Sequence, residues 1–193
     1  MAERGGRRFS QAISEGDGIS VIVHVDGPEA ARTAEEDGAE AVLVRTALAG
    51  IRDATELPIL WDCGGTPDDA QRMGADAMVV VAEDHDDDDD EGLGALAQRA
   101  SGLGLDLVVS VASEDMLERV LEQHDPETFH LATRNLERAL DLLSDVPVGK
   151  LAIAEVGDVT REQVVELERR GVDAVIVPAR NVAELVGGAP PAV

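Results

Sequence analysis

Eight times along its 193 residues, the chain repeats a short apolar run, a polar turn and a helix-like stretch that ends in Gly or Asp. The apolar runs are rich in Val, Ile and Leu, which suits parallel strands buried on both faces. They are Ile19–Val25, Ala41–Arg45, Pro58–Asp62, Ala77–Ala82, Asp106–Val111, Thr128–Thr133, Lys150–Glu155 and Ala174–Val177. Strands that alternate with helices predict an α/β fold, and eight such units predict a minimal (βα)8 TIM barrel with eight parallel strands. An open doubly wound sheet is the alternative.

The length of the chain leaves little room beyond the barrel itself. Such barrels typically run to about 250 residues, with about 200 near the lower end, so we expect no inserted domains. We predict a single barrel over residues 19–188, preceded by an N-terminal segment, 1–18, and followed by a flexible tail, 189–193.

Capping residues mark the starts of several helices. Pro28, Thr66, Ser113 and Thr160 each open a stretch with acidic residues in its first turn, as the helix dipole favours. The second unit has only residues 47–56 between its strand and the next one, so we expect a short helix there. The helix of the fourth unit is expected to be loosened by its glycines, which are Gly92, Gly94, Gly102 and Gly104.

The charge and the cysteine content exclude several classes of partner and site. A net charge of −24 and a pI near 4.2 would repel the phosphates of nucleic acid and the headgroups of anionic membranes. Cys63 is the only cysteine, which excludes an intrachain disulfide and a multi-cysteine metal site, and we expect it to be a small buried thiol. No apolar stretch suits a signal peptide or a membrane span, so we expect a soluble cytoplasmic protein.

One low-complexity segment, Glu83–Glu91, is almost entirely acidic and follows the fourth predicted strand. Runs of like charge usually form solvated loops, and this is the reading that we favour. The alternative is a weak site for a cation or a basic partner, although the segment lacks the spacing of an EF-hand loop.

Several stretches resemble indole-3-glycerol-phosphate synthase, a (βα)8-barrel lyase of tryptophan biosynthesis. The resemblance spans nearly the whole chain. The stretches are Asp26–Ala31, Asp37–Ala39, Leu57–Leu60, Met73–Ala77, Arg134–Leu136, Ile153–Glu155 and Gly171–Val177.

The resemblance implies a lyase that closes an indole ring with two lysines, two glutamates and an asparagine around the barrel opening. In this chain most of those positions hold other residue types. Glu155 and Arg134 agree with functional positions of the family. The replaced positions fall on His24, Asp26, Asp62, Ser110 and Ala132.

The lysine content argues against the family's reaction without any alignment. Ring closure needs an ammonium group as general acid. The one lysine of the chain, Lys150, begins the seventh predicted strand, at the end of the barrel opposite its opening. The resemblance also implies a phosphate grip on glycine and serine after strands seven and eight, where this chain has Val156-Gly157 and Pro178-Ala179. Proline supplies no N–H donor.

An unusual number of polar residues is expected to point into the barrel. Carried over from the family, the inward positions are His24, Asp26, Asp62, Ser110, His130 and Glu155. Because buried carboxylates need partners, one reading is a self-satisfied network in which the histidines or Arg45, Arg134 and Arg180 pair with the acids. The other is an acid–base or divalent-metal site, for which Asp26, Asp62, Glu155 and His24 are weak candidate ligands.

We therefore expect a diverged relative of indole-3-glycerol-phosphate synthase, without synthase activity, that serves as a binding, partner or vestigial scaffold. The alternative is an enzyme of different chemistry that uses Asp62, Glu155 and His24, with or without a metal. No cofactor is expected. The expected partner is a small phosphorylated molecule, and the protein is expected to be a monomer or a homodimer. The candidate catalytic residues are Glu155 and Asp62, and the candidate ligand-binding residues are Arg134, His24, Ser110 and Gly157.

Overall fold

The computed structural model describes residues 8–15, 18–82, 92–180 and 182–186. Its strands form one closed parallel barrel in chain order, with β8 pairing back to β1. This confirms the predicted TIM barrel and overturns the alternative of an open sheet. The strands are β1 (Ser20–His24), β2 (Ala41–Val44), β3 (Ile59–Trp61), β4 (Ala77–Val81), β5 (Asp106–Val111), β6 (Thr128–Leu131), β7 (Leu151–Glu155) and β8 (Ala174–Pro178).

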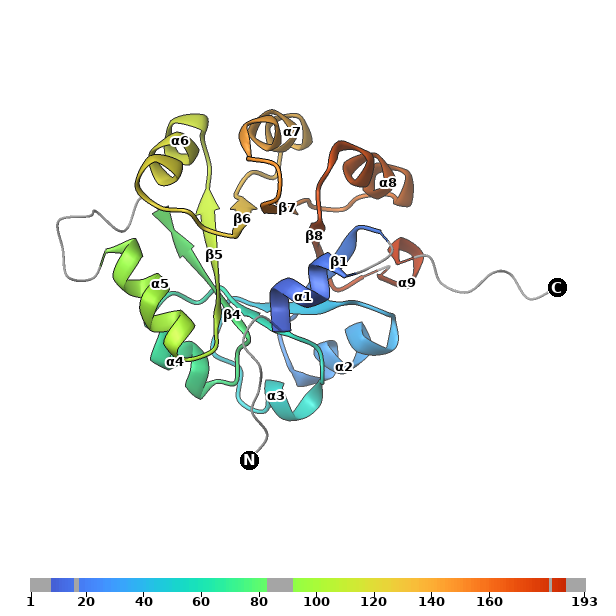
Figure 1. Cartoon of the computed structure of the whole chain (residues 1–193). Helices are drawn as coiled ribbons and strands as arrows, with labels where there is room; N and C mark the ends of the chain where they lie inside the picture. The colour runs from blue at the N-terminus through green and yellow to red at the C-terminus, as the bar shows by residue number, and fades with distance from the viewer. Residues whose placement is uncertain (1–7, 16–17, 83–91, 181, 187–193) are drawn as a thin grey trace.

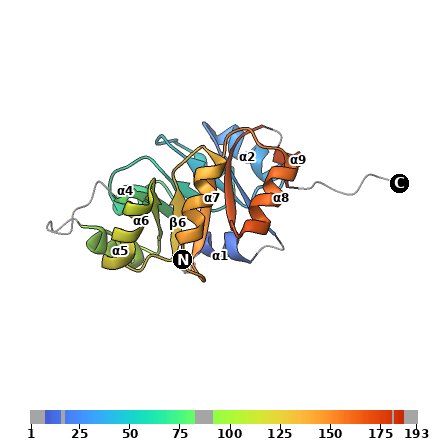
Figure 2. The same cartoon turned by 90° about the horizontal axis from the view of Figure 1, so that it is seen from above.

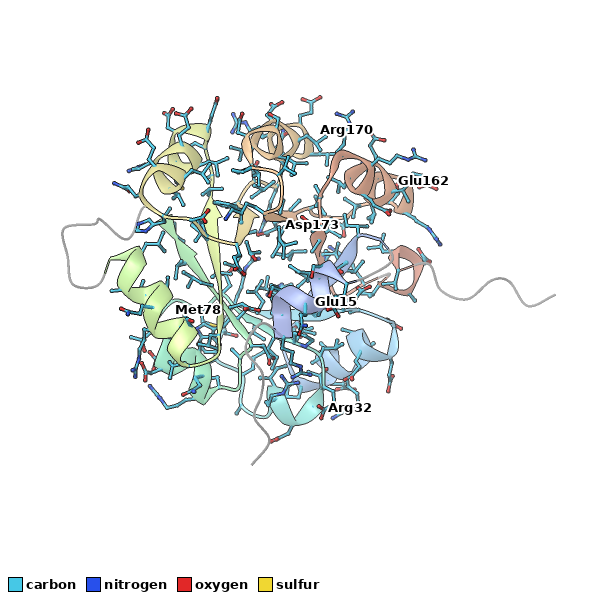
Figure 3. All side chains as sticks on the ribbon, viewed as in Figure 1. Glu15, Arg32, Met78, Glu162, Arg170 and Asp173 are labelled. Atoms are coloured by element: carbon cyan, nitrogen blue, oxygen red, sulfur yellow. The ribbon has the colours of Figure 1, made fainter. Side chains whose placement is uncertain are left out.

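Helices surround this barrel, and α7 and α8 lie next to each other along its outside (Figures 1 and 2). Charged side chains of the helices, among them Glu162 and Arg170 on α8, lie on the outside of the molecule (Figure 3). None of the helices in the described ranges is long and apolar enough to cross a membrane. The helices are α1 (Arg8–Ser14), α2 (Pro28–Glu36), α3 (Ile51–Ala54), α4 (Pro67–Arg72), α5 (Leu93–Gly102), α6 (Glu114–Gln123), α7 (Leu136–Asp145), α8 (Arg161–Arg170) and α9 (Val182–Leu185).

Three helices begin at the capping residues predicted from the sequence. Thr66 and Thr160 form capping boxes at the starts of α4 and α8, and the Ser113 side chain accepts a hydrogen bond from the Met116 N–H at the start of α6. Helix α3 is short, as expected from the few residues available. The glycines of the fourth unit do not interrupt α5, which runs for ten residues.

Three units enter their strands through the same four-residue pattern: a glycine, a small apolar residue, an acid and an alanine. The glycines have φ angles of 90°, 77° and 96°, which suit a residue without a side chain. Each acid accepts a hydrogen bond from an N–H at the start of the preceding strand, and these acids therefore tie the strands together. The bonds run from Val21 to Glu40, from Ile59 to Asp76 and from Ala152 to Asp173, at 2.8, 2.9 and 2.8 Å.

Apolar side chains form two layers. The larger layer lies between the strands and the surrounding helices. The smaller one lies inside the barrel and draws on alternate strand residues, such as Ile22, Leu43 and Leu60. It also includes Phe9 and Ile13 of α1, which contacts β1, β2 and β5. Helix α1 therefore closes the N-terminal end of the barrel, although it lies in the segment predicted to precede it.

The boundary predicted at residue 18 and the flexible tail stay predictions, because the tail, 189–193, lies outside the described residues. The acidic run Glu83–Glu91 lies outside them as well.

Phe9→Ala is expected to destabilise the barrel strongly, since the Phe9 side chain is fully buried in the inner layer. Removing a buried Phe costs about 3–5 kcal/mol. For a domain of this size that lowers Tm by roughly 10 °C or more in thermal unfolding. Val148→Ala is the control. Because Val148 is fully exposed, this variant should have the Tm of the wild type. Equal Tm values for the two variants would contradict a barrel closed by α1.

Candidate functional site

The C-terminal ends of the strands carry a group of polar side chains, which we call the barrel mouth. They continue the alternation that places Ile22, Leu43 and Leu60 in the inner layer. Five of the polar residues follow an inner-layer residue by two positions, within the strand or just beyond its end, and the sixth, His130, is the register partner of Ser110. The mouth residues are His24, Arg45, Asp62, Ser110, His130 and Glu155.

Arg45 connects opposite sides of the mouth. Its Nε donates to Asp62 Oδ2 at 2.9 Å, and Asp62 directly follows the neighbouring strand, β3. Its two terminal nitrogens donate to both carboxylate oxygens of Glu155 on β7, at 3.2 and 2.6 Å. We call this two-bonded contact between Arg45 and Glu155, together with the bond to Asp62, the Arg45 fork. The side chains of Arg45 and Glu155 are 28% and 14% exposed, so the contact between them is largely shielded from water. One guanidinium therefore bonds to both of the candidate catalytic carboxylates.

Glu155 has two further neighbours. Arg134 Nε donates to Glu155 Oε1 at 3.2 Å, and His130 Nε2 lies 3.6 Å from Oε2. His130 and Arg45 hold the pKa of Glu155 well below its ordinary value of 4.5, although burial acts in the opposite direction. Glu155 is therefore ionised throughout the physiological pH range and has no proton to give.

Ser110 and His130 form a buried pair on neighbouring strands. Their Cα atoms are register partners, and Ser110 Oγ lies 3.2 Å from His130 Nδ1. The two residues are 5% and 4% exposed. His130 Nε2 is the one buried side-chain nitrogen or oxygen of the described residues that lacks a hydrogen-bond partner. The sequence placed both residues inward but did not predict the contact, although their matching positions on adjacent strands were the available signal.

His24 completes the mouth at the end of β1. Burial, aided by the positive charge of Arg45, lowers the pKa of His24 below its ordinary value of 6.5, while the nearby acids oppose this. At neutral pH the imidazole is therefore uncharged.

Asp26 and Gly157 lie apart from this network. Asp26 is exposed and lines a cavity beside α2, because β1 ends at His24 and the strand alternation does not continue to Asp26. Gly157 is exposed in the connection between β7 and α8.

Of the two predicted readings, the arrangement is nearer to the ionic network, because Arg45 and Arg134 pair with the acids, although His130 Nε2 lacks a hydrogen-bond partner. Arg180 lies outside it and pairs instead with Asp158, at 3.0 Å. Within the ranges that the structure describes, no group of three or more His, Cys, Asp or Glu side chains is placed to hold a metal ion.

Of two further predicted residues, Cys63 is less buried than expected, and Lys150 lies where the sequence placed it. Cys63 is half-buried, and burial, aided by the charge of Asp62, raises the pKa of its thiol to about 11, so the thiol stays protonated at neutral pH. Lys150 pairs with Asp125 just before β7, at the end of the barrel opposite the mouth.

A separate cavity of about 480 Å³ lies at the N-terminal end of β5 and β6. Its lining includes Ser10, Leu93, Asp106, His124 and Glu127, and none of the mouth residues. It is therefore distinct from the predicted site.

Arg45→Met is expected to destabilise the fold by about 1–3 kcal/mol at pH 7, because it leaves two partly buried carboxylates without their main partner. The native pKa of Glu155 is lower than the unfolded value near 4.5. The stabilisation is therefore complete above about pH 5 and is lost as the pH falls below 4.5 toward the native pKa. The difference in unfolding free energy between wild type and variant should shrink accordingly in denaturant titrations from pH 7 to pH 3.

Arg180→Met is the matched control, because the Arg180–Asp158 pair is exposed on both sides and such pairs contribute little. A loss for Arg45→Met that is independent of pH, or no larger than that of the control, would contradict a buried ionic network.

Comparisons with known proteins agree with the resemblance found in the sequence. No protein-family model matches the chain. The solved structure of thiamine phosphate pyrophosphorylase from Pyrococcus furiosus matches with a TM-score of 0.64 at 17% identity, covering 88% of this chain and 91% of that one. The N-acetylmannosamine-6-phosphate 2-epimerase of Clostridium perfringens matches with a TM-score of 0.69 at 13% identity, covering 92% of each chain. At these identities the likeness shows the fold alone.

Several curated relatives in sequence share one name. Indole-3-glycerol phosphate synthase of Geobacillus thermodenitrificans is 27% identical over 168 residues, which cover 76% of this chain and 64% of that enzyme. The Shouchella clausii enzyme is 29% identical over 168 residues, covering 76% and 65% of the two chains. The Variovorax paradoxus enzyme is 34% identical over 116 residues, covering 56% and 42%. The chain thus spans less than two thirds of the length of these relatives, and it is a (βα)8 barrel similar to indole-3-glycerol phosphate synthases.

Proposed function

We propose that this protein is a relative of indole-3-glycerol phosphate synthase that lacks indole-forming activity and binds a small phosphorylated molecule at its barrel mouth. The observation that carries the proposal is the Arg45 fork, which joins Asp62 and Glu155 in the centre of the mouth.

The acid–base chemistry of ring closure has no donor in this arrangement. The family's lysine positions hold Asp26 and Asp62, and Lys150 is paired at the other end of the barrel. Glu155 matches a functional position of the family, but its low pKa makes it a poor general base and no general acid. These features support a barrel that has lost the synthase reaction.

Arg134 supports the retention of an anion site. Its side chain is 77% exposed, and Nε is the atom that donates to Glu155. The terminal nitrogens of a guanidinium held in this way match the oxygens of a phosphate or carboxylate. The exposed backbone of Gly157 and the neutral ring of His24 add hydrogen-bonding groups at the same end of the barrel.

A second candidate function is an enzyme of different chemistry that uses Asp62, Glu155 and His24. The uncharged imidazole of His24, next to two carboxylates, favours it, since a neutral imidazole accepts a proton or ligates a metal. A rise in Tm with divalent cations that is lost in His24→Ala would favour this function.

We also propose a cytoplasmic location, to which the single cysteine is suited.

Wild-type protein is expected to bind phosphates of the tryptophan pathway without turning them over. The anthranilate and indole phosphates, or inorganic phosphate, at about 100 times Kd should add roughly 2.7 kcal/mol of stability. For a domain of this size that raises Tm by roughly 5–10 °C in thermal unfolding. The same mixtures should yield no indole product by absorbance or mass spectrometry.

Arg134→Gln should abolish the rise in Tm, and Arg138→Gln, which removes an exposed arginine from the first turn of α7, should not. An indole product that disappears in Glu155→Gln would contradict the loss of synthase activity. No rise in Tm with any of the phosphates would contradict the anion site.

A further inference from the structure

Ser110, His130 and Glu155 lie on three consecutive strands, β5, β6 and β7, and their side chains form a connected row. Ser110 Oγ is 3.2 Å from His130 Nδ1, and His130 Nε2 is 3.6 Å from Glu155 Oε2. All three face the inside of the barrel near its mouth, and they are 5%, 4% and 14% exposed.

The charge of Glu155 determines where the imidazole proton lies. An ionised carboxylate only accepts hydrogen bonds, so the nitrogen that faces it, Nε2, carries the hydrogen. Nδ1 is then the acceptor, and Ser110 donates its hydroxyl hydrogen to Nδ1. A hydroxyl that donates to a base, which is in turn oriented by a carboxylate, is the arrangement that activates a serine nucleophile.

The gap of 3.6 Å explains why His130 Nε2 has no hydrogen-bond partner. A shift of about half an ångström would complete the bond, and such bonds commonly tighten when substrate binds. Arg45 and Arg134 hold Glu155 in place beside the ring.

Beside Ser110, the wall of the barrel reaches solvent at Val81. Val81 is the register partner of Ser110 on β4, and 39% of its surface is exposed although it lies at the end of a barrel strand. Ala132, two residues beyond His130, is exposed as well and carries only a methyl group. A small acyl group that reaches Ser110, which is 5% exposed, would pass along the apolar side chain of Val81.

We propose that Ser110 is the nucleophile of an acyl-transfer site, with His130 as its general base, for small esters or thioesters. Ser110 Oγ bonds to the carbonyl carbon, and its proton moves to His130 Nδ1. The bond from the carbonyl carbon to the leaving oxygen or sulfur breaks, and the proton passes to that leaving group. Water then attacks the acyl-serine by the same route and releases a carboxylic acid.

Glu155 acts through His130 and is a positioning residue. Because Arg45 and Arg134 share its charge, Glu155 stabilises the positive charge that develops on His130 in the transition state less than an unpaired carboxylate would. Turnover should therefore be slow, and covalent trapping is the suitable measurement.

The test is labelling of the full chain with a fluorophosphonate, which forms a bond from serine Oγ to phosphorus and releases fluoride. Intact-mass analysis and peptide mapping should find one adduct, on Ser110. The adduct should be absent in Ser110→Ala and form about 100-fold more slowly in His130→Gln, in line with the contribution of a general base. Ser144→Ala, which removes an exposed serine of α7, should label as the wild type does.

Should Ser110→Ala fail to fold, Ser110→Cys preserves the size of the side chain and keeps a nucleophile, and acetylation by p-nitrophenyl acetate should then map to residue 110. For Glu155, the profile of labelling rate against pH should move in Glu155→Gln and return toward wild type in Glu155→Asp. The proposal is overturned by the absence of any adduct, by adducts spread over exposed serines, or by labelling of Ser110 at the same rate in His130→Gln. Phosphate binding through Arg134 is measured separately, so either result stands without the other.

Discussion

The arrangement of side chains at the barrel mouth depends on the hydrogen bonds of the Arg45 guanidinium. The guanidinium lies between Asp62 and Glu155, and it makes three hydrogen bonds across the end of the barrel. Two carboxylates facing the inside of a barrel would repel each other and lose their hydration, and removing the cation would leave that cost uncompensated. With the cation present, Glu155 stays charged, and that charge in turn orders His130, Ser110 and Arg134.

This network also bears on the proposed loss of synthase activity. Ring closure needs an ammonium group as general acid, whereas the mouth residues include no lysine and Glu155 stays ionised at physiological pH. What the mouth retains is an exposed arginine, a neutral imidazole and a serine beside a histidine. These suit anion binding and a simpler reaction at a carbonyl carbon better than they suit indole formation.

Most of the fold was predictable because local patterns and tertiary structure agree. The sequence Gly74-Ala-Asp-Ala77 illustrates this: the glycine turns the chain, and the acid bonds to the N–H of Ile59 at the start of the preceding strand. The role of α1 was not predictable in this way, because Phe9 and Ile13 form a short apolar pair whose partners are distant in the chain. Helix α5 formed despite its glycines, since its buried residues, Leu93 and Ala100, lie on the face toward the barrel.

The sequence predicted which residues form the site better than it predicted the hydrogen bonds between them. The family resemblance placed His24, Asp62, Ser110 and Glu155 on the inside, and the structure brings them together, whereas Asp26, placed inward as well, is exposed. Alternation cannot say which acid an arginine will reach, because that depends on side-chain length and on distances across the barrel. Arg45 therefore bonds to β7, on the far side, while Arg180 pairs with Asp158 in the adjacent loop.

A double-mutant cycle between Arg45 and Glu155 tests the central claim most directly. Unfolding free energies at pH 7 would be measured for wild type, Arg45→Met, Glu155→Gln and the double variant. If the two residues form a shielded ion pair, the double variant should be more stable than the sum of the single losses implies, with a coupling of about 1–3 kcal/mol. Additive losses, with no coupling, would contradict the account.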